Sequence, residues 1–111
     1  MKYIIKGKGG QGTLFLSMVI ARALLLSGIE NFSFLKEFDE GQRNGEIKVT
    51  FNLPFDFADK KLILKEHNMI ELRRVIKDLN INEDNIKEAL RVIKPEAFIK
   101  NLEIWKQKKL N

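Results

Sequence analysis

A cluster of glycines separates a short apolar run from a long one near the start of the chain. Residues 2–6 read KYIIK, residues 7–12 read GKGGQG, and residues 13–27 are apolar except for Arg22 and a few small polar side chains. This order predicts a buried strand, a tight turn and a buried helix that ends at Gly28, because glycine accepts the left-handed conformation beyond a helix. The strand–turn–helix unit places the chain in the α/β class.

Two further strands are predicted before the middle of the chain. Residues 32–36 are apolar enough for a second strand, and residues 46–53 alternate between apolar and polar side chains, which indicates a strand with one buried face. Only a polar stretch ending in the turn dipeptide Asn44-Gly45 separates them, whereas a parallel crossover needs roughly a dozen residues. The third strand is therefore expected to be antiparallel to the second. Residues 62–65 suggest a short fourth strand, so we expect a small mixed sheet of three or four strands.

The second half of the chain is predicted to be helical. Asn82 is expected to cap one helix, and Pro95 to end it and open the last helix. Apolar residues recur at helical spacing in three groups: Leu72, Val75, Ile76 and Leu79; Ile86, Leu90 and Ile93; Phe98, Leu102 and Trp105. We expect a single domain over 1–111, with an α/β part over 1–53 and a helical part over 62–111. This is an incomplete Rossmann-type, α/β/α-like arrangement.

The composition narrows the classes of function that the chain can serve. None of the 111 residues is a cysteine, which excludes disulfides, thiolate metal ligands and cysteine-bound iron–sulfur clusters within this chain. The same observation agrees with a reducing compartment, and we expect a cytoplasmic protein. The apolar segment 14–26 is shorter than the roughly 20 residues that span a bilayer, and Arg22 interrupts it, so no membrane contact is expected.

Charge and reactive side chains exclude further classes. The net charge of +5 raises nucleic-acid binding as a hypothesis, but the basic residues are mixed with acidic ones, so we expect no nucleic-acid partner. No nucleophile is placed beside His67, the single histidine, so no catalytic residue is expected. The acidic residues Glu37, Asp39 and Glu40 lack a second set of ligands, so no metal site is expected.

The glycine turn itself supports two interpretations. Gly7, Gly9 and Gly12 satisfy the Gly-x-Gly-x-x-Gly pattern between a predicted strand and a predicted helix. Glycine lets backbone N–H groups approach a phosphate, the helix start adds its positive end, and Lys8 adds a cation. A complete dinucleotide fold, however, needs about six strands and an acidic residue at the end of the second strand, whereas Glu30 stands before that strand. A phosphate-binding turn and a purely structural turn both stay open.

Two motifs resemble the gamma subunit, or gamma domain, of the 2-oxoacid:ferredoxin oxidoreductases, such as pyruvate synthase. The family's Gly-x-Gly-Gly-Gln-Gly turn is matched by Gly7, Gly9, Gly10, Gln11 and Gly12. Its Gly-Pro-Glu-x-Arg-Gly-Gly loop is matched by Arg43 and Gly45, and departs from the pattern at Asp39, Glu40, Gly41 and Asn44. The last helix, with Pro95 and Asn101, is similar to the family's closing Lys-Pro-x-x-x-x-x-Asn segment. Relative to the family the chain looks shortened in the middle, between about Leu53 and Leu62.

The resemblance implies a non-catalytic gamma-like subunit of a complex that converts a 2-oxoacid and coenzyme A to acyl-CoA and CO2 while reducing ferredoxin. It implies alpha, beta and delta partner subunits, with thiamine diphosphate and iron–sulfur clusters on those partners and coenzyme A as the one ligand considered for this chain. The alternative is a free-standing, shortened relative that acts as a dimeric nucleotide- or coenzyme-A-binding module or as a scaffold. The predicted binding residues are Gly7, Lys8, Gly9, Gly10, Gln11, Gly12 and Arg43.

Overall fold

The protein is a four-stranded sheet with four helices. A computed structural model describes residues 1–38 and 45–109. The strands are β1 (Lys2–Lys8), β2 (Ser33–Phe38), β3 (Glu46–Asn52) and β4 (Lys60–Ile63). The helices are α1 (Thr13–Leu26), α2 (Asn68–Leu79), α3 (Glu83–Ile93) and α4 (Phe98–Lys109), and the 3₁₀ turn η1 (Pro95–Ala97) leads into α4.

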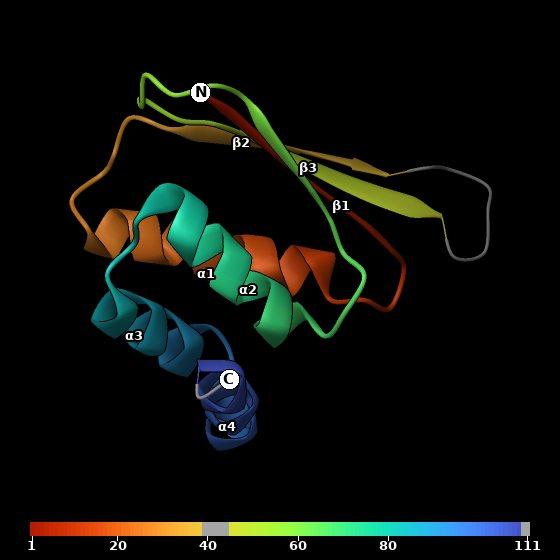
Figure 1. The fold of residues 1–111 in the computed structure, drawn as a ribbon, viewed down its shortest axis with the longest axis vertical. Helices are drawn as coiled ribbons and strands as arrows, with labels where there is room; N and C mark the ends of the chain where they lie inside the picture. The colour runs from red at the N-terminus through yellow and green to blue at the C-terminus, as the bar shows by residue number, and fades with distance from the viewer. Residues whose placement is uncertain (39–44, 110–111) are drawn as a thin grey trace.

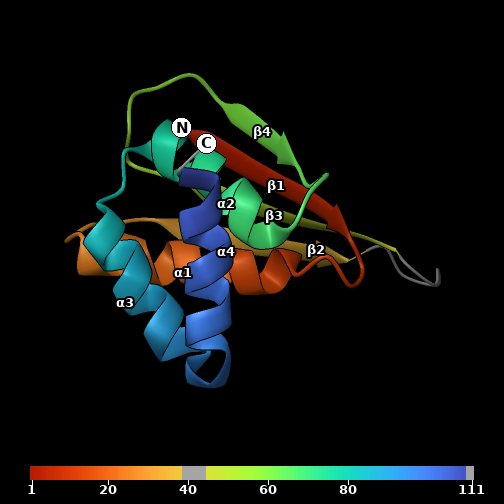
Figure 2. The same cartoon turned by 60° about the horizontal axis from the view of Figure 1, so that its bottom comes forward.

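The sheet is mixed, as the sequence predicts. Its strand order is β2-β3-β1-β4, with β3 antiparallel to both of its neighbours and β4 parallel to β1. Figure 2 shows β4 at the edge of the sheet beside β1. This fourth strand begins at Lys60, two residues before the predicted segment 62–65. The strand begins with two lysines, and because lysine is depleted in strands the sequence did not predict its start. Pairing with β1 sets the register of this strand.

All helices lie on one side of the sheet (Figure 1). α1 packs against β1 and β3, α3 packs on α1, and α4 packs on α2. α1 therefore lies between the sheet and α3, which explains why it is apolar around most of its circumference. The largest fully buried side chains of the core come from every layer: Tyr3, Ile5, Leu16, Ile20, Leu24, Phe51, Met69, Leu72, Ile86, Leu90 and Trp105. In the described part of the chain no helix covers the opposite, outer face of the sheet, unlike the layering of a complete Rossmann-type fold.

The helix boundaries follow the predicted signals. Gly28 has φ +83° just after α1, and Pro95 ends α3 and opens η1. The Asn82 side chain accepts a hydrogen bond of 2.8 Å from the amide of Asp84 at the start of α3. Asn80 ends α2 in the left-handed conformation, with φ 52°.

A cation–π contact holds the last helix, α4, against α2. Trp105 is buried, and the Arg73 guanidinium lies 3.9 Å from the centre of its ring. Arg73 also donates hydrogen bonds to the Trp105 carbonyl oxygen and to the Glu83 carboxylate, the latter at 3.0 Å. The Trp105 side chain therefore docks the last helix against the rest of this chain.

The second helix is tied to the sheet by a buried phenol. The Tyr3 hydroxyl, on β1, donates a 2.7 Å hydrogen bond to a carboxylate oxygen of Asp78 on α2. Lys60, on β4, forms an ion pair with the other oxygen of Asp78 at 3.2 Å. Burial, and next the hydrogen bond and charge of Asp78, raise the pKa of Tyr3 well above its ordinary value. The phenol therefore stays protonated as long as the protein stays folded.

This arrangement predicts how the protein behaves in alkali. Tyr3 is the only tyrosine, so absorbance at 295 nm reports its ionisation alone. The unfolded chain releases the phenolic proton near pH 10 and the folded chain retains it. Stability should therefore be complete below about pH 10 and fall above it, by up to about 1.4 kcal/mol per pH unit. Tyrosinate absorbance should appear together with loss of far-ultraviolet circular dichroism.

An absorbance step near pH 10 with native circular dichroism would contradict this prediction. Asp78→Asn serves as the matched variant, because it removes the carboxylate and leaves the phenol buried. Ionisation should then begin at a lower pH than in the unmodified protein.

Candidate functional site

Gly7 belongs to the strand, and its role is close packing. β1 runs through Lys8, and Gly7 is buried on the face that the helices cover. A Cβ atom added to Gly7 would overlap the Thr13 hydroxyl at the start of α1 and lie 3.0 Å from a Leu64 methyl carbon. The absence of a side chain therefore lets α1 begin directly against β1.

Hydrogen bonds outside the strand pairing use three amides of residues 7–12. The Gly9 N–H donates to the Gly45 carbonyl at 3.2 Å, and the Gln11 N–H donates to the Lys8 carbonyl at 3.1 Å. The Gln11 side chain accepts a 2.6 Å hydrogen bond from the Lys8 amide and donates a longer one, 3.4 Å, to Leu64. Gln11 therefore closes the turn rather than presenting its amide group to a ligand.

The start of α1 keeps its amides open. Gly12 is the N-cap residue, with φ +76°, and it offers no side chain to cap the helix. The first turn contains no acidic residue, and the first bonded amide is that of Leu16, which donates to the Gly12 carbonyl at 3.0 Å. Among the described residues no acceptor meets the amides of residues 13–15. An uncapped helix start of this kind favours an anion.

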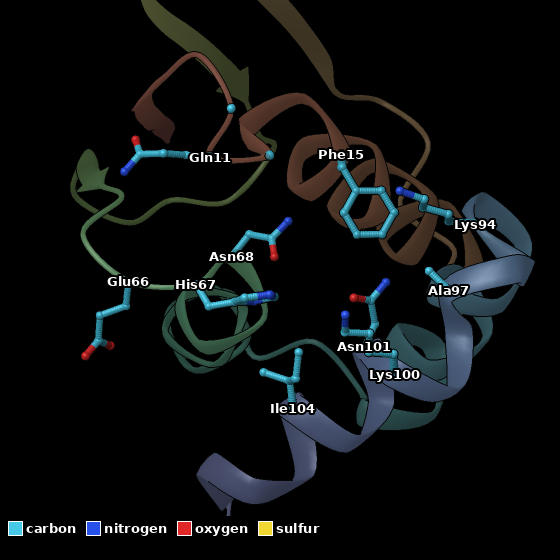
Figure 3. A pocket seen from close by; sticks show the side chains of 12 residues that line it. Gln11, Phe15, Glu66, His67, Asn68, Lys94, Ala97, Lys100, Asn101 and Ile104 are labelled. Atoms are coloured by element: carbon cyan, nitrogen blue, oxygen red, sulfur yellow. The ribbon is translucent and has the colours of Figure 1, made fainter. Parts of the chain in front are cut away.

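A pocket of about 460 Å³ lies beside this helix start. Its walls come from the beginnings of three helices, because α2 and α4 start next to α1 (Figure 3). The lining residues are Gly10, Gln11, Gly12, Phe15, Glu66, His67, Asn68, Lys94, Ala97, Lys100, Asn101 and Ile104. Figure 3 shows Asn68, His67 and Asn101 around the cavity, while the Glu66 carboxylate points away from it.

The charges of the pocket suit an anion. Lys94 and Lys100 stand on its rim, and among the described residues neither has an ion-pair partner. The one carboxylate of the lining, Glu66, lies 3.7 Å from the guanidinium of Arg74. His67 Nδ1 accepts a 3.1 Å hydrogen bond from the Met69 amide, so the neutral ring carries its proton on Nε2, where it can donate.

The structure separates the residues that the sequence groups into one site. Gly10, Gln11 and Gly12 line the pocket, whereas Gly7, Lys8 and Gly9 do not. Arg43 lies outside the described residues, as do Asp39 and Glu40. A binding role for the predicted set stays a prediction.

Nine of the twelve lining residues lie outside the predicted site. Apart from Glu66, which points away, the polar ones are His67, Asn68, Lys94, Lys100 and Asn101. His67 is exposed, and the sequence places no nucleophile beside it. Lys94 and Asn101 belong to the Lys-Pro-x-x-x-x-x-Asn segment, so a signal was present in the sequence, but its place beside the glycine turn follows only from how α4 packs.

Two hydroxyls near the turn are packing groups. Thr13 and Ser17 are both buried, and the Ser17 hydroxyl donates a 2.9 Å hydrogen bond to the Thr13 carbonyl oxygen. The Thr13 hydroxyl faces Gly7 and is not part of the pocket lining. Neither hydroxyl is therefore placed to contact a phosphate there.

The described residues contain neither a candidate metal cluster nor a membrane-spanning helix. No three histidine, aspartate or glutamate side chains in residues 1–38 and 45–109 gather in an arrangement that could hold a metal ion. Within the same ranges no helix is both long and apolar enough to cross a bilayer.

Alanine substitutions should separate the roles of the glycines. Gly10→Ala meets open space, so only its positive φ of +88° is strained, at a cost of about 1–2 kcal/mol. Gly12→Ala combines positive φ with a clash against the Asn68 side chain, and Gly7→Ala clashes with buried Thr13. Both should cost more than Gly10→Ala, about 2–4 kcal/mol. Urea unfolding measures the order, and equal losses for all three variants would refute these roles.

The fold of this chain is found among solved structures. The gamma subunit of a keto/oxoacid ferredoxin oxidoreductase from Geobacter sulfurreducens PCA superposes with a TM-score of 0.74 at 14% sequence identity. The superposition covers 96% of this chain and 94% of that one. No protein-family model and no curated protein matches the sequence.

The superposition bears on two expectations. The resemblance to a gamma subunit is supported at the level of the fold. The expected shortening in the middle is not seen against this structure, because nearly the whole of its chain is covered. The chain thus shares the fold of that structure over nearly the whole length of both.

Proposed function

We propose that this chain is a non-catalytic, gamma-like subunit of a cytoplasmic 2-oxoacid:ferredoxin oxidoreductase complex. The fold that it shares with the Geobacter gamma subunit over nearly the whole length of both chains is the observation that carries the proposal. The glycine turn adds support, because it stands between β1 and α1 as the family motif requires.

In the proposed complex the chemistry belongs to the partner subunits. Alpha and beta subunits would hold thiamine diphosphate, and beta and delta subunits the iron–sulfur clusters. The reaction would convert a 2-oxoacid and coenzyme A to acyl-CoA and CO2, with ferredoxin as electron acceptor. This chain would contribute binding surface, and its only histidine, His67, already serves as the N-cap of α2.

Reconstitution tests the proposal. The alpha, beta and delta subunits should co-elute with this chain in size-exclusion chromatography, and 2-oxoacid-dependent reduction of ferredoxin should be higher with the chain than without it. The control mixture replaces this chain with an unrelated basic protein of similar mass. Elution of the chain at its own volume, whichever subunits are present, would refute the subunit role.

The pocket beside α1 favours a second function. In this alternative the chain would be a free-standing, dimeric module, and its pocket would bind the phosphate group of a nucleotide or of coenzyme A. The ligand part of this alternative is supported by the uncapped start of α1 and by Lys94 and Lys100, which form no salt bridge among the described residues. All six residues of edge strand β2 are exposed, which supports the dimer part, since an open strand edge can pair with another chain.

Titration calorimetry tests the ligand. Coenzyme A and ATP should bind, and adenosine, which lacks a phosphate, should not. Lys94→Gln with Lys100→Gln should weaken binding about tenfold, as expected for two partly exposed charge contacts. Lys77→Gln, at an exposed position of α2 outside the pocket, should leave the affinity unchanged. No heat with either phosphate compound would eliminate the ligand and leave only a scaffold.

A further inference from the structure

The outer face of the sheet carries a concentration of positive charge. Strand register places five lysines on this face and only two acidic side chains from the strands, Glu37 and Glu46. The lysines are Lys2, Lys6, Lys8, Lys48 and Lys61. A further carboxylate, that of Asp59, binds the backbone amide of Lys2 at 2.7 Å at one end of the face. The central strands thus direct much of the chain's net charge of +5 toward one side.

Three of these lysines are neighbours at the centre of the face. Lys6 and Lys48 are directly paired across β1 and β3, and Lys61 is paired with Ile4, diagonally next to Lys6. The neighbouring Lys6 side chain and its charge, next the loss of hydration, and more weakly the charge of Lys48, lower the pKa of Lys61. Like charges opposite one another in a sheet are destabilising. The isolated chain therefore keeps an arrangement that costs folding free energy.

The carboxylates of the face balance only part of this charge. Glu46 forms an ion pair with Lys6 at 3.3 Å, and Glu37 stands opposite Lys48 in the register. Lys61 has no carboxylate opposite it, since its partner on β1 is Ile4. Among the described residues, no salt bridge is formed by Lys61.

Apolar side chains are exposed among the lysines. Leu35 on β2 is 59% exposed and Ile63 on β4 is 51% exposed, and both point to the outer face. Figure 1 shows that the helices leave this side of the sheet open. A surface that combines exposed apolar groups with charges of a single sign is typical of a protein–protein contact.

We propose that the outer face of the sheet, centred on Lys6, Lys48 and Lys61, docks onto an acidic surface of a partner subunit. The inference rests on the proposed function, which supplies the partner subunits. A second copy of this chain fits poorly, because two such faces would repel. Nucleic acid fits poorly as well, because Glu37 and Glu46 would face its phosphates.

The charge-reversal variant Lys48→Glu with Lys61→Glu tests the proposal. Each new carboxylate would neighbour Lys6 and relieve a like-charge contact, whereas the one at position 48 would also stand opposite Glu37. These two effects oppose each other, so the variant should fold with its stability about unchanged. Its affinity for the alpha, beta and delta subunits should fall at least tenfold in 50 mM salt. The affinity of the unmodified protein should itself weaken between 50 and 200 mM salt, because salt screens exposed charges.

The control is Lys77→Glu with Lys87→Glu, which makes the same change in net charge on α2 and α3 and should bind like the unmodified protein. Equal affinity of the outer-face variant and the unmodified protein would overturn this inference alone. Failure of the unmodified protein to bind any subunit would overturn the proposed function together with it. Salt-dependent binding to a DNA or RNA duplex, or a homodimer that the outer-face variant dissociates, would also overturn the inference.

Discussion

The closeness of α1 to β1 is the constraint on which the rest of the structure depends. Gly7 has no side chain where the Thr13 hydroxyl lies, and Gly12 takes a left-handed conformation to turn the chain into the helix. With larger side chains, α1 would have to lie farther from the sheet. α1 would then no longer fill the layer between the sheet and α3, and α2 would lose the neighbour beside which it packs.

The same constraint creates the pocket. Because α1 starts directly under the end of β1, its first turn lies next to the starts of α2 and α4. The start of α1 brings partial positive charge from its unpaired amides, and Lys94 and Lys100 add full charges. The Gln11 side chain is hydrogen-bonded to Lys8 and Leu64 and closes the turn. The groups that can attract an anion are therefore the start of α1 and residues that lie far from the glycines in sequence.

Local patterns predicted the elements well, and tertiary contacts decided what the patterns could not. The alternation through β3 and the signals at Gly28, Asn82 and Pro95 depend on short-range physics, and the structure confirms them. The start of β4 was placed too late because pairing with β1 outweighs the low strand preference of its lysines. The five pocket residues of segment 94–104 were missed for a similar reason: the pocket joins the glycine turn to a segment some 80 or more residues away, and nothing in either segment encodes the other.

The two charged features of the molecule lie on different sides and can act together. The pocket opens among the helix starts, whereas the lysines of the outer face lie on the side of the sheet that the helices leave open (Figures 1 and 3). A partner that covered the outer face would relieve the repulsion around Lys6 without covering the pocket. Function in a shared fold resides in such surfaces rather than in the fold itself. Packing alone accounts for Gly7 and Gly12, so the placement of lysines on these two surfaces is the more specific basis for the proposed roles.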